Sequence, residues 1–368
     1  MTGRGSPLVV QHSLLESRGG AARVADMLAA GLPGLGWRCR RTFEMAETQE
    51  GADALAREPS EIRLARAVES GAILHLHSSL DWPGLLGGLR GAPLVVHLHD
   101  CRLFTGGCPF PVDCREHERG CPDPCPRGHA GSRALAEASL AAVEDAAPTL
   151  VAPSRWMAKL AGGVLERPVE VVPNGVEWPD ERPSRAKARH ALGIAERARV
   201  ALFAAHGAEK AGFKGGERWR GVWERIAGEL PDVLCLMAGG GESGREGRLL
   251  RFPYLDQPKL RLVMAAADLL LYPTLADNHP LIILEAMASA TPTLAFAVGG
   301  IPEQIEPGET GFLARPGDWK ALGRIAVELL GSRHSLTEAG ARAFTSGRER
   351  FSLAAMASAQ DIILRRKI

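Results

Sequence analysis

The sequence predicts an α/β protein built from two Rossmann-like domains. Three observations support this prediction: the length, an ordinary globular composition, and two series of short apolar runs that alternate with helical stretches. The chain has 368 residues, and a domain usually holds about 100–200 residues. Hydrophobic residues make up 45% and charged residues 24% of the chain, which is typical of a folded globular protein and excludes wholesale disorder.

The first series of apolar runs lies in the first half of the chain. Continuous runs of this kind are typical of parallel strands that are buried on both faces. They are found at residues 8–10, 73–77, 94–99, 149–152 and 169–172. Helical stretches separate the runs, and this alternation predicts right-handed βαβ units.

A turn and a linker separate the first series from the second. Pro173–Gly175 is a turn signal, and a segment rich in proline and charge follows it. The second series comprises residues 200–203, 233–237, 268–272 and 293–296, and the chain from 319 onward is helical in pattern. The predicted parts are an N-terminal domain over 1–173, a linker over 174–188, a C-terminal domain over 189–350 and a helix over 351–368. One possible arrangement is that this last helix packs back on the N-terminal domain.

Charge and cysteine content narrow the classes of function and location. Lys and Arg total 44 against 43 Asp and Glu, so the chain lacks the excess of positive charge that nucleic-acid binding usually needs. No apolar run reaches the roughly 18 residues of a transmembrane helix, and residues 1–13 do not resemble a secretory signal. The seven cysteines are an odd number, which argues against a disulfide scaffold. We therefore expect a cytoplasmic protein, with a location at the inner face of the membrane left open.

The segment 277–288 joins a polar turn to an apolar helix that contains one acid, Glu285. The apolar residues recur at helical spacing, so we expect this helix to be part of the core. Backbone N–H groups over 280–282 would lie at the helix start and could bind oxygen atoms. The alternative interpretation is that Asp277 caps the helix and that Glu285 reaches solvent.

A second segment places two glycines, Gly299 and Gly300, between a strand and a helix start marked by Pro302. Glycines let a backbone approach a ligand closely, and a helix N-terminus favours an anion. A plain tight turn is the alternative, because two glycines alone are weak evidence. Open α/β sheets bind ligands beyond the carboxyl ends of their strands, so we predict the site in a cleft between the two domains.

Together these segments, within residues 267–318, resemble the C-terminal domain of the retaining glycosyltransferases of family four. That family's signature has two acids separated by seven residues, then Ala-Met-Ala, a proline-containing strand and Gly-Gly-Ile-Pro-Glu. The matching residues in this chain are Asp277, Glu285, Ala286–Ala288, Thr291–Thr293, Gly299–Glu303 and Glu309–Gly311. The segments Arg18–Arg23, Val151–Ser154 and Val172–Val176 are also similar to the family. Asp in place of the first Glu, followed by Asn278, resembles the subset that serves surface polysaccharides.

The resemblance implies the GT-B fold, in which two Rossmann-like domains face a central cleft. It also implies a hexosyltransferase-type enzyme that moves a sugar, with retention, from a nucleoside-diphosphate sugar to a hydroxyl of a glycan or lipid-linked acceptor in polysaccharide or glycoconjugate biosynthesis. The chemistry would need no cofactor, and a peripheral membrane contact stays open. Two alternatives remain, because fold does not fix function: another GT-B enzyme, such as a sugar-nucleotide epimerase or a phosphorylase, or a non-catalytic nucleotide-sugar or glycan-binding protein. The base, sugar, acceptor, linkage and oligomeric state are left unspecified.

The resemblance further implies the residues of the site. His99 would contact the donor sugar, Asp277 would position it, and Glu285 would hold the ribose hydroxyls, so these three are the catalytic candidates. The donor-binding candidates are Glu285 together with Gly19, Gly20, Lys214, Asn278, His279, Leu281, Gly299 and Gly300. Lys214 and the start of the helix after Gly300 would face the diphosphate. The family usually has an arginine shortly before its Lys-Gly pair; this chain lacks it, and Lys210 is the candidate substitute.

Four cysteines are concentrated in a Gly- and Pro-rich segment, 101–128, that resembles an insertion in some of these transferases. They are Cys108, Cys114, Cys121 and Cys125, and four thiolates could close a tetrahedral structural zinc site. Their spacing differs from the usual knuckle, so reduced packed thiols and disulfides formed on isolation are alternatives. Because the segment directly follows His99, we predict that it shapes the acceptor side of the cleft.

Overall fold

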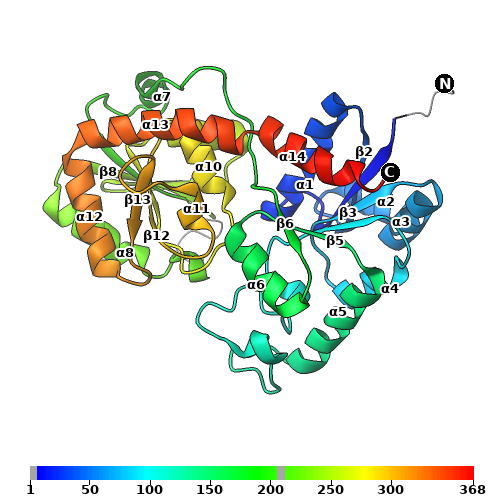
Figure 1. Cartoon of the computed structure of the whole chain (residues 1–368). Coiled ribbons are helices and arrows are strands. Elements are labelled where there is room, and N and C mark those ends of the chain that lie inside the picture. Colours follow the sequence, from blue (N-terminus) through cyan, green and yellow to red (C-terminus); the bar gives the residue numbers. More distant parts are fainter. Residues whose placement is uncertain (1–5, 205–211) are drawn as a thin grey trace. The chain divides into compact units, whose positions relative to one another are not determined.

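The computed structural model describes residues 6–204 and 212–368. The chain divides into two compact units, of which the first comprises Met1–Gly175 and Leu353–Ile368 and the second comprises Val176–Ser352. Each unit contains one sheet with helices packed on it (Figure 1).

The first unit has a six-stranded parallel sheet in the order β2-β1-β3-β4-β5-β6. Its strands are β1 (Leu8–Leu15), β2 (Arg38–Met45), β3 (Ile73–Leu76), β4 (Leu94–His97), β5 (Thr149–Ala152) and β6 (Val169–Val171). Its helices are α1 (Gly19–Gly31), α2 (Gln49–Arg57), α3 (Ser60–Glu69), α4 (Trp82–Gly88), α5 (Ser132–Ala146), α6 (Arg155–Leu165) and α14 (Leu353–Arg365), with 3-10 turns η1 (Leu32–Leu35), η2 (Arg102–Phe104) and η3 (Glu116–Arg119). The sequence predicted every one of these strands except β2.

The two faces of this first sheet differ in chemistry. Side chains alternate between the faces of a strand, and Leu74, Leu76, Leu94 and Val96 pack into a buried apolar core with residues of α3, α4, α5 and α6. The alternate positions of β3 and β4 therefore project from the opposite face. Ile73 and Val95 occupy some of these positions, and the fully buried histidines His75 and His97 occupy the others.

The second unit has a seven-stranded sheet in the order β13-β12-β11-β7-β8-β10-β9, in which only β9 runs antiparallel to its neighbour. Its strands are β7 (Arg199–Ala204), β8 (Val233–Gly240), β9 (Gly244–Glu246), β10 (Leu249–Pro253), β11 (Leu269–Tyr272), β12 (Thr293–Phe296) and β13 (Gly311–Ala314). Its helices are α7 (Arg185–Ala191), α8 (Trp219–Glu229), α9 (Gln257–Ala266), α10 (Leu281–Ala288), α11 (Ile301–Gln304), α12 (Trp319–Gly331) and α13 (Arg333–Phe351), with a 3-10 turn η5 (Gly212–Lys214).

The predicted linker contains the start of a helix. Ser184 caps α7 by accepting a hydrogen bond from the Lys187 amide at 3.3 Å, as serine commonly does at helix starts. Arg189 of the same helix forms a buried ion pair with Asp268 at 2.8 Å. This contact fixes α7 to the second unit.

The order of the second sheet identifies where a ligand would be expected. Strand β7 pairs with β8 on one side and with β11 on the other. From β7 the chain adds β8 and then β10 on one side, whereas from β11 it adds β12 and then β13 on the other, so the strand order reverses between β7 and β11. Such a reversal in an open α/β sheet creates a crevice beyond the carboxyl ends of the strands. The loops that follow β7 and β11 carry Lys214 and Asp277.

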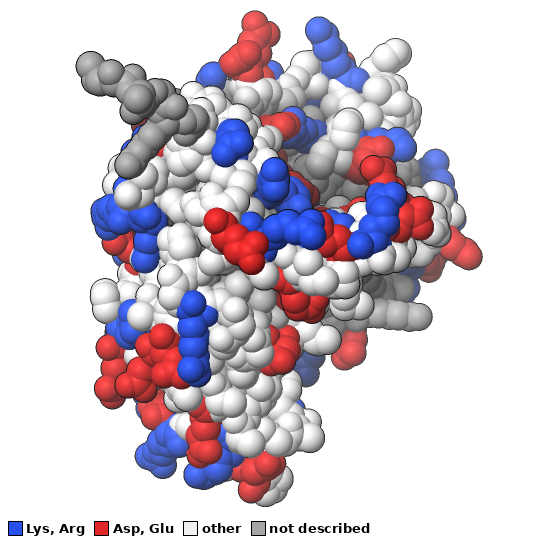
Figure 2. Space-filling model, turned by 90° about the vertical axis from the view of Figure 1, so that its right-hand side faces the viewer, with Lys and Arg blue, Asp and Glu red and all other residues white. Residues whose placement is uncertain are grey.

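Charges are mixed on the visible surface. On the face shown in Figure 2, Lys and Arg lie among Asp and Glu without a large area of one sign, in keeping with a net charge of +1. In the described part of the chain, no helix has the length and apolar character needed to cross a membrane.

Candidate donor-binding site

The loop after β11 is shaped by Asp277. The Tyr272 hydroxyl donates a hydrogen bond to Asp277 Oδ2 at 2.6 Å, and the Asn278 amide donates to Oδ1 at 2.8 Å. Burial, and then the neighbouring Asp277 carboxylate, raise the pKa of Tyr272 well above its usual value, so the hydroxyl keeps its proton and remains a donor. Both carboxylate oxygens of Asp277 thus hold the turn, and a contact with a sugar hydroxyl would use their remaining lone pairs.

Helix α10 begins at Leu281, with Pro280 as its N-cap. The interpretation of Asp277 as the cap is therefore wrong. The prediction of a free N–H at residue 280 is also wrong, because proline has none. The amide groups left without helical partners at this helix start belong to residues 281–283.

Glu285 is buried within α10, in which seven of the eight residues are buried. Its exposed fraction is only 3%, so the alternative in which this side chain reaches solvent is wrong. A buried carboxylate is stable only when polar groups hydrogen-bond to it. This requirement fits a residue that holds hydroxyl groups of a ligand, the role expected for Glu285.

His279 connects the start of α10 to α11. Its Nδ1 lies 3.1 Å from Gln304 Nε2, which also donates to the Pro280 carbonyl at 3.2 Å. The ring of Phe351 packs edge-on at a centroid distance of 5.5 Å. The structure thus gives the His279 ring a packing role, and its expected contact with the donor stays a prediction, as does that of Asn278 and Leu281.

Gly299 brings the two predicted segments into direct contact. Its φ is +57°, and a Cβ at this position would lie 1.8 Å from the Asp277 carbonyl oxygen. Only glycine fits there. The helix that follows, α11, has four residues, and the Ile301 amide already donates to the Val298 carbonyl at 3.1 Å. An anion at this loop would therefore meet the amides of Gly299 and Gly300 rather than the amide of Ile301 or a long helix dipole.

The loop that carries Lys214 packs on the same part of the sheet. The Leu275 amide donates to the Phe213 carbonyl at 2.6 Å. Gly215 has a φ of +81°, and a Cβ there would lie 2.3 Å from the Pro273 carbonyl oxygen. Lys214, which is half-buried, is therefore attached to the turn that contains Asp277. Lys210 lies outside the described residues.

In the first unit, Gly19 begins α1 directly after β1. Gly19 and Gly20 are exposed, and a Cβ on either would meet nothing within 4 Å. The preceding turn is held by Glu47 Oε2, which accepts hydrogen bonds from the amides of Ser17 at 2.8 Å and Arg18 at 2.7 Å. The open start of a 13-residue helix can bind an anion, as expected for this loop.

His99 follows β4 and contacts a second histidine. Its Nε2 lies 2.9 Å from His77 Nδ1. Burial lowers the pKa of His99 well below its usual value, and the nearby His97 and His75 lower it further. His99 is therefore neutral near pH 7, and it can exchange hydrogen bonds with a hydroxyl but supplies no positive charge.

The four cysteines of the insertion line one small cavity together with His117. All four are free thiols. Burial raises the pKa of Cys121, and the nearby thiols of Cys125, Cys114 and Cys108 raise it further. The Arg127 amide donates to Cys125 Sγ at 3.4 Å. The fold thus places the four residues around one cavity, but among the described residues no three of their sulfur atoms lie within 4.8 Å of one another, so binding one ion would require the loop to close further.

Most of the second unit is similar to a known protein family. Residues 219–332 match the family model described as "Glycosyl transferases group 1". The second unit thus contains a segment that is similar to the group 1 glycosyltransferases. The match covers α8 to α12 and so includes Asp277, Glu285 and Gly299, and the predicted resemblance to family four is confirmed.

Several curated proteins that are similar to this chain carry glycosyltransferase names. A "D-inositol 3-phosphate glycosyltransferase" of Mycobacterium sp. (strain KMS) is 33% identical over 171 residues, which are 41% of this chain and 37% of the relative. An enzyme of the same name from Nocardioides sp. is 30% identical and spans 74% of this chain and 63% of its own length. An "N-acetyl-alpha-D-glucosaminyl L-malate synthase" of Bacillus anthracis is 34% identical over 35% of this chain and 36% of its own length. The chain thus spans about a third to a half of most of the curated relatives it matches.

Solved structures show the fold of the chain. Sucrose-phosphate synthase from Thermosynechococcus elongatus superimposes with a TM-score of 0.74 at 18% identity, covering 98% of both chains. Anabaena Alr3699/HepE in complex with UDP-glucose gives a TM-score of 0.69 at 18% identity, covering 98% of this chain and 99% of its own. The predicted GT-B class, with two Rossmann-like domains, is confirmed.

Proposed function

We propose that this protein is a retaining glycosyltransferase that moves a sugar from a nucleoside-diphosphate sugar to an acceptor hydroxyl. The observation that carries the proposal is the packing of three loops at the switch point of the second sheet. Gly215 and Gly299 each have no room for a Cβ, and each meets the backbone of the segment 273–277. The names of the relatives and the UDP-glucose complex of Alr3699/HepE support the same conclusion.

The proposed roles follow from the charges that develop during transfer. Positive charge grows on the sugar, and negative charge grows on the departing diphosphate. Lys214 and the amides of Gly299 and Gly300 would stabilise the diphosphate. Glu285 would accept hydrogen bonds from the ribose hydroxyls. Asp277 would orient the sugar through the turn that it holds.

A thermal-shift screen tests the donor. UDP-, GDP-, ADP- and dTDP-sugars should be compared, beginning with UDP-glucose, the ligand in the Alr3699/HepE structure. A ligand at a hundredfold excess over its Kd stabilises the native state by about 2.7 kcal/mol. If none of these nucleoside-diphosphate sugars raises the melting temperature, the proposal is contradicted.

Turnover separates the proposal from its alternatives. Release of nucleoside diphosphate should require an acceptor, and D-inositol 3-phosphate and L-malate are the first compounds to test because the relatives' names contain them. Binding without turnover on these or on lipid-linked glycans would favour a non-catalytic binding protein. Visible absorbance from pyridoxal phosphate would favour a phosphorylase. A lipid-linked acceptor, a role in polysaccharide biosynthesis and a peripheral membrane contact stay predictions of the sequence.

Lys214→Ala should lower kcat/KM for the donor strongly while acceptor KM changes little, because the lysine charge serves the leaving diphosphate. A charge-assisted hydrogen bond is worth about 1.5–3 kcal/mol, so the loss should be roughly 10- to 100-fold. Lys320→Ala is the matched control, since Lys320 is exposed on α12 of the same unit. A larger loss in Lys210→Ala than in Lys214→Ala would show that Lys210 serves the diphosphate instead.

We also propose that the cavity lined by the four cysteines of the insertion binds a structural Zn²⁺ ion. The neighbouring thiols seen in the structure support this, and so does the amide that points at Cys125 Sγ, since such donors stabilise a thiolate. Purified protein should contain about one equivalent of thiolate-bound zinc. Chelation should lower acceptor use and stability while donor binding in the second unit persists. Zinc-free protein with an ordered loop and full activity would contradict this proposal.

A further inference from the structure

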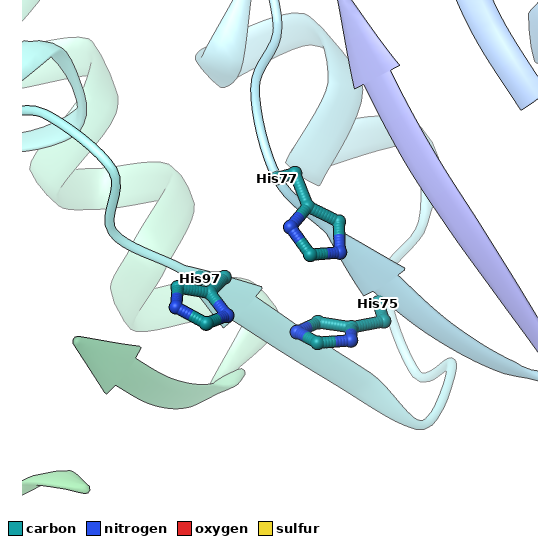
Figure 3. A group of neighbouring side chains, drawn as sticks. All are labelled: His75, His77 and His97. Carbon is teal, nitrogen blue, oxygen red and sulfur yellow. The ribbon is translucent and has the colours of Figure 1, made fainter. Parts of the chain in front are cut away.

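Three histidines lie close together on the face of the first sheet that is opposite its apolar core. His75 and His77 lie two residues apart on and just after β3, and His97 ends the neighbouring strand β4. Figure 3 shows the three rings turned toward one another around a common space. One ligand nitrogen from each ring lies within 4.8 Å of those from the other two. Among the residues that the structure describes, no other group of three metal-ligating side chains has its ligand atoms this close together. The group does not include any of the cysteines that line the cavity of the insertion.

The buried ring nitrogens of this group lack the hydrogen-bond or metal partners that such atoms usually have. His75 and His97 have no exposed surface, and within the described residues all four of their ring nitrogens are buried without a hydrogen-bond partner. Buried polar atoms are nearly always satisfied by protein, water or an ion. Burial lowers the pKa of His97 to about 3, and burial followed by the neighbouring His97 lowers that of His75. Both rings are therefore neutral, which is the form that binds metals.

We propose that His75, His77 and His97 bind one divalent transition-metal ion, with Zn²⁺ as the ion that best suits three buried imidazoles. Three histidines are an established donor set for zinc, and imidazole suits zinc, copper, iron and nickel better than magnesium or calcium. A carboxamide already orients one ring, because Gln11 Oε1 lies 2.7 Å from His77 Nε2. A partner of this kind fixes the tautomer of a metal-binding histidine and leaves Nδ1 as its ligand atom.

The distances are compatible with this site after a small contraction. Zn–N bonds of about 2.0–2.1 Å place the nitrogens of a tetrahedral site roughly 3.3–3.4 Å apart. The nitrogens here lie within 4.8 Å, so rotations of the rings would bring them to the ion. The ion would join the ends of β3 and β4. The ion would take the lone pair of His77 Nδ1, which now lies 2.9 Å from His99 Nε2. Metal binding would therefore replace this hydrogen bond, and the position of His99 would depend on the metal.

The test must separate this site from the cysteine cavity. In a variant with Cys108, Cys114, Cys121 and Cys125 all changed to Ser, added Zn²⁺ should remain at about one equivalent after dialysis. The variant loaded with Co²⁺ should show visible d–d bands without thiolate charge transfer. Adding His75→Gln or His97→Gln should abolish both signals. His12→Gln is the matched control and should keep them, because His12 is a buried histidine of β1 that bonds to Thr42 at 2.9 Å instead.

X-ray absorption on the zinc-loaded wild-type protein keeps the proposal testable if the cysteine variant fails to fold. Imidazole scattering that disappears in His75→Gln supports the site. A zinc edge with sulfur ligands alone overturns it, as does a folded cysteine variant that retains no metal. Retention of the same metal by His75→Gln, His97→Gln and the unsubstituted background also overturns it. None of these readouts depends on transferase activity, so they stand apart from the proposed function.

Discussion

Gly299→Ala should destabilise the second unit and abolish donor binding together. The new Cβ would lie 1.8 Å from the Asp277 carbonyl oxygen at a φ of +57°. The obstacle is backbone, so no side-chain rotation relieves the clash, and the turn held by Tyr272 and Asn278 must move. Steric conflict combined with a left-handed φ should cost at least about 2–3 kcal/mol of unfolding free energy. Urea unfolding and the donor thermal-shift assay measure the two effects.

Gly331→Ala is the matched control for that substitution. Gly331 is the last residue of α12, and a Cβ there would meet nothing within 4 Å at an ordinary φ. Alanine favours helix over glycine by up to about 1 kcal/mol, so this variant should be as stable as the wild type or slightly more stable. If Gly299→Ala unfolds like Gly331→Ala and binds donors normally, the packing of the two loops is not what the structure shows.

The central strands could be predicted because burial leaves a plain signal in sequence. Strands β3, β4, β11 and β12 are runs of apolar residues, and the structure buries them on both faces. β2 gave no such signal. It reads Arg-Cys-Arg-Arg-Thr-Phe-Glu-Met at the edge of its sheet, and of its eight residues only Thr42 is buried. Its strand character comes from pairing with β1, which is tertiary context.

The candidate site could be predicted as a set of segments but not as an arrangement. Asp277, Glu285 and Gly299 were identified singly from pattern and resemblance. That Gly299 packs on the Asp277 carbonyl, and that Tyr272 holds the Asp277 carboxylate, depend on how β11 and β12 lie in the sheet. No pattern in either segment specifies the contact of Gly299 with Asp277, which are 22 residues apart, or the path of the turn that brings Tyr272 to Asp277.

The histidine group shows the same limit. Two His-x-His pairs, at 75–77 and 97–99, are visible in the sequence, and alternate positions of a strand share one face. Only His99 was predicted as a site residue, and that prediction came from the family resemblance, because a strand histidine taken alone is usually a core residue. The group becomes visible once β3 pairs with β4 in the register that places His75 opposite Val95, which brings the end of the first pair to the start of the second.

Glu285→Gln should weaken donor binding by roughly 10- to 100-fold, because a charged acceptor for ribose hydroxyls is worth about 1.5–3 kcal/mol. The side chain is 3% exposed within α10, and glutamine keeps its size, so the fold should survive the change. Calorimetry with the nucleoside diphosphate identified in the screen gives the Kd. Glu328→Gln is the matched control, since Glu328 is exposed on α12 and pairs with Arg324 at 2.9 Å. An unchanged Kd in folded Glu285→Gln would show that the buried carboxylate stabilises the loop and does not bind the ribose.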